Sequence, residues 1–197
     1  PPPQARTIPN AFVATPMAKF EGPWAMTFLP DGRLLVTEKK GALKVLKIGG
    51  TAANVSGVPT VDYGGQGGFG DVILHPGFAS NGIIYLSYVE AGENDTRGAV
   101  VARAKLTLDD KGGGALSDVK TIWSQVPKVT GRGHYGHRMA FGPDGALYIV
   151  DLYRGVLQHR ISLTTYLRRQ SEDRKLVDPQ HLGRIYRVVP SNQSARR

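Results

Sequence analysis

The sequence of 197 residues contains no cysteine. This excludes disulfide bonds, thiolate catalysis and zinc sites built on cysteine, although it leaves the cellular compartment open. No run of about 18 consecutive apolar residues is present, so we expect no transmembrane helix. The chain opens on Pro1-Pro2-Pro3, without an initiating methionine or a visible signal peptide. We interpret this start as the result of processing or as the boundary of a fragment.

Acidic residues are fewer than basic residues, which leaves a net charge of +9. A basic surface can attract nucleic acid, anionic lipid or an anionic small molecule. Much of the excess lies in the C-terminal stretch from Arg154 to Arg197. No basic motif is interleaved with aromatic residues in the manner of RNA-binding modules. We therefore expect a solvated basic tail and no nucleic-acid partner.

Glycine and proline are frequent, with 25 and 13 residues, which suits many turns between short strands. After an irregular, proline-rich arm over residues 1–10, alternating apolar and polar residues predict a series of strands. The turn sequence Pro30-Asp31-Gly32 joins the first two of them. The expected strands cover 24–29, 33–38 and 42–48, with an edge strand over 58–62.

The same arrangement recurs further along the chain. Strand patterns return over 71–76, 83–89, 99–106 and 119–123. Met139–Gly145 then repeats Met26–Gly32 almost residue for residue. A repeat of about 40–50 residues with four strands is the signature of a propeller blade. The predicted fold class is therefore all-β, with about three four-stranded antiparallel sheets arranged as β-propeller blades.

We expect a single partial propeller domain. Its blades are assigned to residues 20–62, 63–125 and 131–189, and a polar tail follows over 190–197. The stretch 163–176 lacks glycine and proline and carries a few apolar residues among charges, which predicts a short helix inserted in the third blade.

One glycine-rich loop, Gly131–Arg138, holds two histidines and two arginines just before a hydrophobic strand. An imidazole suits general-base catalysis because its ordinary pKa lies near neutrality. The alternative for His134 is a loop histidine bonded to the backbone. His134 and His137 alone are too few ligands for a metal site, so no metal ligand is assigned.

A second glycine-rich segment, Gly64-Gly65-Gln66-Gly67-Gly68, could let the backbone approach a ligand closely. A tight crossing between two blades explains the same glycines equally well. The segment is not a phosphate-binding loop, because no Gly-Lys-Ser/Thr follows it and no helix begins there.

Three motifs resemble the pyrroloquinoline-quinone (PQQ)-dependent glucose/sorbosone dehydrogenase family, in the order that the family has them. They are Pro23–Glu38, Gly65–Tyr88 (with Asp71–Pro76 and Asn81–Tyr88) and Gly133–Gly145. The match covers about residues 20–150, and 151–189 is similar to the final blade of larger sorbosone-dehydrogenase-like proteins. The resemblance implies a six-bladed propeller in the periplasm or outside the cell. It would bind PQQ and calcium and oxidise a sugar or other alcohol, passing electrons to an acceptor.

The resemblance also implies roles for individual residues. His134 matches the catalytic base, and Gln66 matches a glutamine that touches both substrate and cofactor. Arg138 matches a position in the catalytic motif, where we expect a structural or anion-pairing role. Arg154, near Asp151 at the end of a predicted strand, could pair with PQQ carboxylates, although an ordinary surface position explains it equally well.

Two departures from the family pattern leave alternatives open. Gly133 stands where the family has an acidic or polar residue, and the middle blades that supply the calcium ligands are missing after Val150. Three blades do not close a ring. The chain is then a fragment, a truncated relative, or half of a homo-oligomeric ring. Instead of an enzyme it could be a non-catalytic module that binds carbohydrate or protein. A lactone-hydrolysing propeller would need a Glu, Asn and Asp calcium set that the sequence does not assemble.

Overall fold

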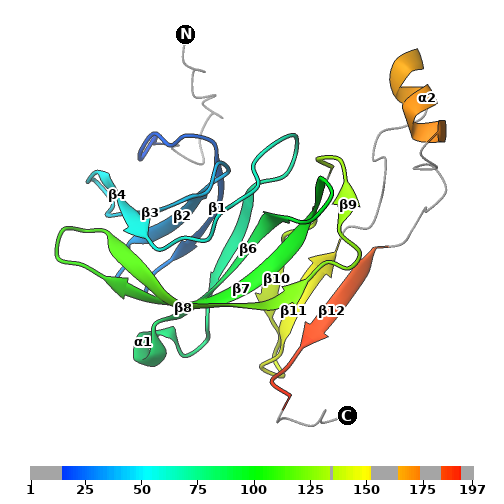
Figure 1. The fold of residues 1–197 in the computed structure, drawn as a ribbon. Coiled ribbons are helices and arrows are strands. Elements are labelled where there is room, and N and C mark those ends of the chain that lie inside the picture. The colour runs from blue at the N-terminus through cyan, green and yellow to red at the C-terminus, as the bar shows by residue number, and fades with distance from the viewer. Residues whose placement is uncertain (1–14, 134, 152–163, 174–182, 192–197) are drawn as a thin grey trace, which may run out of the picture.

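The computed structural model describes residues 15–133, 135–151, 164–173 and 183–191. Its strands form three neighbouring groups, which we call the first, second and third blade (Figure 1). The fold is built mainly of strands, so the all-β prediction is confirmed. Among the described residues, no helix is both long and apolar enough to cross a membrane.

The first blade is a four-stranded antiparallel meander. Its strands are β1 (Pro23–Phe28), β2 (Leu34–Glu38), β3 (Ala42–Leu46) and β4 (Ala52–Ser56). The predicted edge strand over 58–62 is wrong, because the fourth strand lies earlier in the chain. Val55 of β4 is buried and pairs with Leu43, whereas Pro59 has no N–H to donate to a ladder.

The second blade has four longer antiparallel strands. They are β5 (Phe69–Leu74), β6 (Ile83–Ala91), β7 (Thr96–Leu108) and β8 (Gly114–Ser124), with the short β9 (Val129–Thr130) beside β7. The turn between β5 and β6 contains a single helical turn, α1 (Phe78–Asn81), which ends at Gly82 in the left-handed conformation.

The third blade contains three described strands instead of the four expected. They are β10 (Met139–Phe141), β11 (Leu147–Asp151) and β12 (Arg184–Val188), all antiparallel. The helix predicted over 163–176 is confirmed as α2 (Thr165–Asp173) within the described residues.

The first two blades join at their outer strands. β4 and β8 pair in parallel through Val55–Gly114 and Ser56–Ala115, while the innermost strands β1 and β5 lie against each other. The two blades therefore form a nearly closed sheet. Glycine permits the close approach at the junction, because a Cβ on Gly57 (φ +72°) would lie 2.5 Å from the Leu116 carbonyl oxygen.

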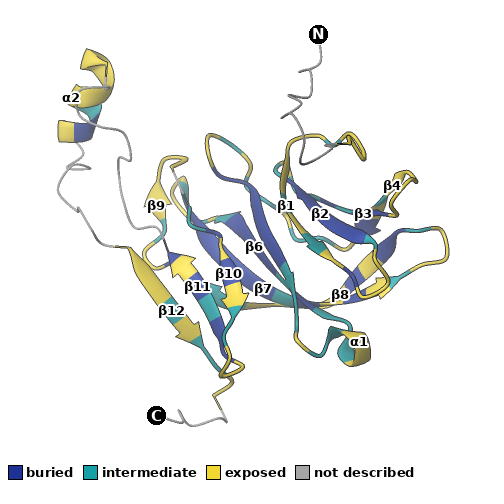
Figure 2. Cartoon of the chain, turned by 180° about the vertical axis from the view of Figure 1, so that it is seen from behind, coloured by how far each residue is buried: buried dark blue, intermediate teal, exposed yellow. Residues whose placement is uncertain are grey.

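Two hydrophobic cores lie between the three blades, one on each face of the second blade. Side chains alternate across a strand, so adjacent residues of β7 enter different cores. Val100 packs toward the first blade with Leu35 and Ile84, and Val101 packs toward the third blade with Met139 and Ile149. The second blade is consequently covered on both faces, as its buried strands in Figure 2 show.

Apolar side chains remain exposed on the outward faces of the outer blades. On β1, Trp24, Met26 and Phe28 are 51%, 64% and 58% exposed. On the same face of this blade, a small buried cluster packs with Phe20 and consists of Leu34, Val36 and Leu46. On the third blade, Val150 pairs with Ile185, which is 71% exposed, and β12 is mostly exposed in Figure 2. Among the described residues, no further blade packs on these two faces.

Truncation of Ile84 tests the first core. Ile84 is fully buried, so Ile84→Ala should lower the free energy of unfolding by about 2–5 kcal/mol through lost burial and a residual cavity. Ile48→Ala, at a 54% exposed position, is the control and should change it by less than about 1 kcal/mol. Equal losses in urea titrations of both variants would contradict the assigned core.

Candidate functional site

Two loops that are distant in sequence meet at one end of the second blade. The β4–β5 loop, residues 57–68, carries Gln66, and the 125–138 segment after β8 carries the histidine-containing loop. The Gln66 N–H donates to the Arg132 carbonyl oxygen at 3.2 Å. The Gln66 side chain lies in an exposed position beside the segment that contains His134. The two motifs singled out in the sequence are therefore brought together.

Glycines make this contact possible. The Arg132 side chain occupies the space that a Cβ of Gly64 would need, and a Cβ on Gly65 would lie 2.5 Å from the Arg132 carbonyl oxygen. A Cβ on Gly67 would lie 2.9 Å from the ring of Tyr135. The glycines thus form a tight crossing between loops, as one of the two sequence interpretations expected.

Asp71 fixes the point where the second loop enters β10. Its buried carboxylate accepts hydrogen bonds from the N–H groups of Met139 at 2.9 Å and Val72 at 3.0 Å. The Ser87 hydroxyl accepts from the Asp71 N–H and donates to the His137 carbonyl, both at 2.8 Å. Burial raises the pKa of Asp71, although the Met139 hydrogen bond acts in the opposite direction.

Arg138 lies at the rim of this arrangement. Its Nη1 is 3.7 Å from the Asp71 carboxylate, and its side chain is 74% exposed. The distance is too long for a strong hydrogen bond, so Arg138 offers a nearly free positive charge beside a buried carboxylate. The anion-pairing role of Arg138 stays a prediction.

His137 and Tyr135 lie beneath the glycine-rich segment. His137 is 5% exposed and packs on Gly70, where a Cβ would lie 2.5 Å from its Nδ1. Its two ring nitrogens and the Tyr135 hydroxyl have no hydrogen-bond partner among the described residues. Burial, with a smaller effect of Lys39, lowers the pKa of His137 to about 4. His137 is therefore a neutral, buried ring and does not face the loop surface.

The remaining predicted site residues are placed as follows. His134 and Arg154 lie outside the described residues. Asp151, at the end of β11, is buried, and burial raises its pKa. No group of three His, Cys, Asp or Glu side chains that could hold a metal ion occurs within the described residues.

Three charged residues of this region carry no signal in the sequence. Asp62, Asp71 and Arg97 are each surrounded by residues that suit an ordinary strand or turn. Their roles arise from partners 35 to 70 residues away in the chain. A charge placed next to a buried apolar run, such as Asp71 before Val72, is the only local hint.

A groove lies elsewhere, at the opposite end of the first two blades. Its volume is about 790 Å³, and Leu29, Asp31, Phe78, Arg103 and Asp118 are among its lining residues. None of the predicted site residues that the structure describes is among its lining residues. We place the candidate site at the loop crossing, because the motif residues converge there.

Comparison with known proteins assigns the family. A model of the glucose/sorbosone dehydrogenase family matches residues 20–190. The chain belongs to this family. It is 40% identical over 133 residues to the aldose sugar dehydrogenase YliI of Escherichia coli, a match that covers 66% of this chain and 35% of the relative. A second relative, an uncharacterised protein of Synechocystis, is 31% identical over 85% of this chain and 40% of its own length.

Solved structures agree with this assignment. The apo-form aldose sugar dehydrogenase of E. coli superposes with a TM-score of 0.59 and 38% identity, covering 66% of this chain and 37% of that one. The PQQ-bound aldose sugar dehydrogenase of Streptomyces coelicolor has a TM-score of 0.60 and 26% identity, covering 91% and 48%. The chain thus spans well under half the length of the curated relatives it matches.

The buried imidazole gives a pH test. A pKa near 4 in the folded state and 6.5 in the unfolded state means that acid protonates the unfolded chain first. His137 should therefore reduce the free energy of unfolding as the pH falls from 6.5 to 4, by about 3 kcal/mol in total. His137→Asn keeps a residue type that tolerates φ +55° and should remove this loss in urea titrations.

The difference between wild type and variant isolates His137, because Asp71 and Asp151 are present in both. An unchanged slope in His137→Asn would contradict a buried, neutral His137.

Proposed function

We propose that this family member oxidises a hydroxyl group of a sugar or other alcohol with PQQ as the electron acceptor, and that His134 is the general base. The observation that carries the proposal is the contact of the Gln66 segment with the 131–138 loop, through the Gln66–Arg132 backbone hydrogen bond. Membership of the family supports it, as do relatives that are named aldose sugar dehydrogenases.

The side chains around the crossing suit part of an anionic quinone. Lys39 donates to the Gly65 carbonyl at 3.2 Å, and Arg132 and Arg138 expose cationic heads nearby. Cationic donors bind carboxylates strongly, and PQQ carries several carboxylates. Gln66, His134 and Arg154 are the residues we assign to the cofactor, with Lys39 and Arg132 as candidates added by the geometry.

The described residues contain no cluster of three His, Cys, Asp or Glu side chains that could hold calcium. We therefore derive no step through calcium.

The proposed chemistry divides between cofactor and protein. When bound, PQQ supplies the acceptor for the hydride that leaves the alcohol carbon. In this proposal, the His134 imidazole takes the proton of the hydroxyl group, and the Gln66 amide orients that hydroxyl toward the base. Arg138 stays near Asp71 and stabilises anionic charge without exchanging a proton.

Dye reduction tests the proposed reaction. With PQQ, calcium and a panel of sugars, the chain should reduce an artificial electron acceptor. His134→Ala should lower kcat about 10²–10⁴-fold, because a general base contributes that range. His75→Ala, whose Nδ1 accepts from the Gly77 N–H in the β5–β6 turn, is the matched control and should retain turnover. Absence of PQQ binding at saturating concentration would reject the dehydrogenase and favour a carbohydrate- or protein-binding module.

We also propose that the protein lies in the periplasm or is secreted, as the resemblance implies, and that it passes electrons to an acceptor. A periplasmic extract that lacks the protein while the cytoplasm contains it would reject this assignment.

A second copy of the chain is the partner we propose for the exposed apolar faces. Three blades in each of two copies make the six that the family resemblance implies. In a two-fold pair, the β1 face with Met26 and Phe28 would cover the Val150–Ile185 face of the partner, and the reverse contact would be identical. The contact would bury these four apolar side chains, although the third-blade face also carries the Arg187–Asp144 ion pair.

Light scattering tests the pairing. Wild type should have twice the mass of one chain at micromolar concentration, and Met26→Glu should be a monomer because it would bury a charge. Val119→Glu, at an exposed apolar position on β8, is the control and should remain a dimer. A monomeric wild type would contradict the pairing, and further blades of a longer chain would then be the occupant.

A further inference from the structure

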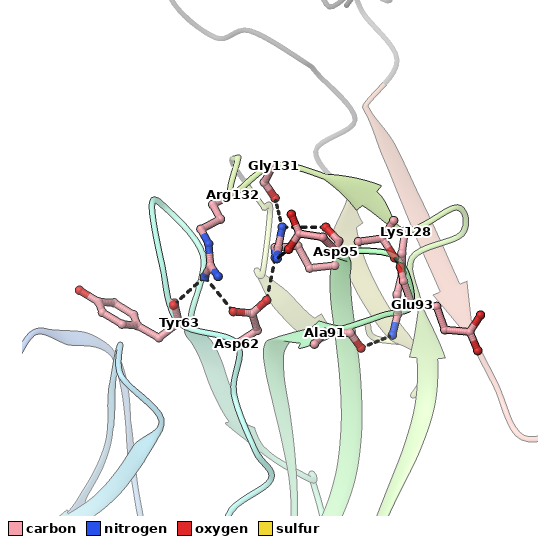
Figure 3. A network of polar contacts seen from close by, with 10 residues as sticks. Asp62, Tyr63, Ala91, Glu93, Asp95, Lys128, Gly131 and Arg132 are labelled. Carbon is pink, nitrogen blue, oxygen red and sulfur yellow. Dashed lines mark hydrogen bonds and ion pairs between the residues drawn. The ribbon is translucent and has the colours of Figure 1, made fainter.

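The Asp62 carboxylate joins the two loops of the candidate site. Asp62 lies in the β4–β5 loop, four residues before Gln66. Its Oδ2 accepts from Arg97 Nε at 2.7 Å, and its Oδ1 accepts from Arg132 Nη1 at 2.8 Å. Only 14% of its side chain is exposed. One carboxylate is therefore shared by two arginines from two other segments of the chain (Figure 3).

Arg97 is the more buried of the two arginines that bind Asp62. It lies in β7, and only 7% of its side chain is exposed. Besides Asp62 it binds the Asp95 carboxylate at 2.5 Å and carbonyl oxygen at 3.0 Å, and the Gly131 carbonyl at 3.2 Å. Arg97 thus holds the β4–β5 loop and the start of the histidine loop against the same strand.

Arg132 is the second arginine that binds Asp62. Its Nη1 also donates to the Tyr63 carbonyl at 2.8 Å, while its own carbonyl accepts the Gln66 N–H. Figure 3 shows Arg132 reaching over Tyr63 and Asp62 from the neighbouring loop. The side chain of Arg132 therefore contacts Asp62 and Tyr63, at the start of this stretch, and its backbone contacts Gln66 at the end.

Asp62 and Arg97 are buried, whereas Arg132 is partly exposed. Exposed ion pairs contribute little, but removing one partner of a buried pair displaces what it held. Loss of the Asp62 charge would leave Arg97 with Asp95 as its carboxylate partner and would remove the carboxylate that Arg132 binds. The β4–β5 loop would then lose its ionic contacts with β7 and with the 131–138 loop, close to the point where Gln66 meets Arg132.

We propose that Asp62 is a positioning residue that fixes the Gln66 segment relative to the 131–138 loop, and does so through Arg97 and Arg132 without touching the substrate. Its effect on turnover rests on the proposed function, whereas its effect on the loops does not. In this arrangement Asp62 determines whether Gln66 and the proposed base reach the same hydroxyl.

Hydrogen exchange, measured without any cofactor, tests whether Asp62 holds the two loops together. Asp62→Asn keeps the side-chain size and removes the charge. The Gln66 amide and peptides within 129–138 should exchange at least tenfold faster, while the β6 core should exchange as in wild type. Asp31→Asn is the matched control, because Asp31 binds Arg33 at 2.7 Å at the opposite end of the blade. Unchanged exchange in both loops would overturn the proposal.

Kinetics separates positioning from a purely structural role. In Asp62→Asn, kcat per folded molecule should fall about 10–100-fold, since small misplacements of reacting groups have effects of this size. The pKa in the kcat–pH profile should stay unchanged, because Asp62 is not the base. A wild-type kcat in a variant with faster loop exchange would overturn the positioning role.

A double variant completes the test. Asp62→Asn combined with Arg97→Gln should lose less activity than the product of the two single losses, because both variants remove the Asp62–Arg97 contact. Multiplied losses would contradict a shared contact. If wild type neither binds PQQ nor turns over, the proposed function fails, and the exchange rates still decide whether Asp62 holds the loops.

Discussion

The close contact between the glycine-rich segment and the histidine loop is the constraint on which the candidate site depends. At Gly64, Gly65, Gly67 and Gly70 a side chain would collide with Arg132, Tyr135 or His137. Because glycine lacks a Cβ, the two backbones approach closely enough for the Gln66 N–H to reach the Arg132 carbonyl. Without this approach, Gln66 would lie away from the loop that carries the proposed base.

Charged side chains turn this close approach into a defined arrangement. Asp62 is bound by Arg97 and Arg132 above the crossing, and Asp71 binds the backbone where the loop enters β10. The loop from Gly131 to Met139 is therefore held at both ends by carboxylates of the second blade and its preceding loop. Such fixed geometry is what hydride transfer requires, because the base, the hydroxyl and the acceptor must align together.

The strands were largely predictable from sequence, because alternation and turn residues are local signals. The hairpin around Pro30-Asp31-Gly32 and its repeat near Asp144 follow directly from such patterns. The edge strand predicted over 58–62 was wrong because Val58 and Val61 pack on the first core from a loop. A short segment with two apolar residues does not by itself distinguish a strand from a loop with two inward side chains.

The site was predictable only in part. The family resemblance identified Gln66 and the histidine loop, and the structure brings their segments together. Asp62 and Arg97 escaped prediction because neither belongs to a local motif and their partners lie 35 and 70 residues apart in the chain. The burial of His137 was not predicted, because neither its left-handed backbone nor the contact of its ring with Gly70 has a local signal.

We propose that the crossing of the two loops forms a PQQ site, in a chain that covers well under half the length of its relatives. A calorimetric titration of the 197-residue chain with PQQ, in calcium-containing buffer, tests this site. PQQ should bind saturably, with one molecule per chain, and at least tenfold more weakly when Gln66→Ala and Arg132→Gln are combined. The absence of heat and of binding at saturating PQQ would contradict it.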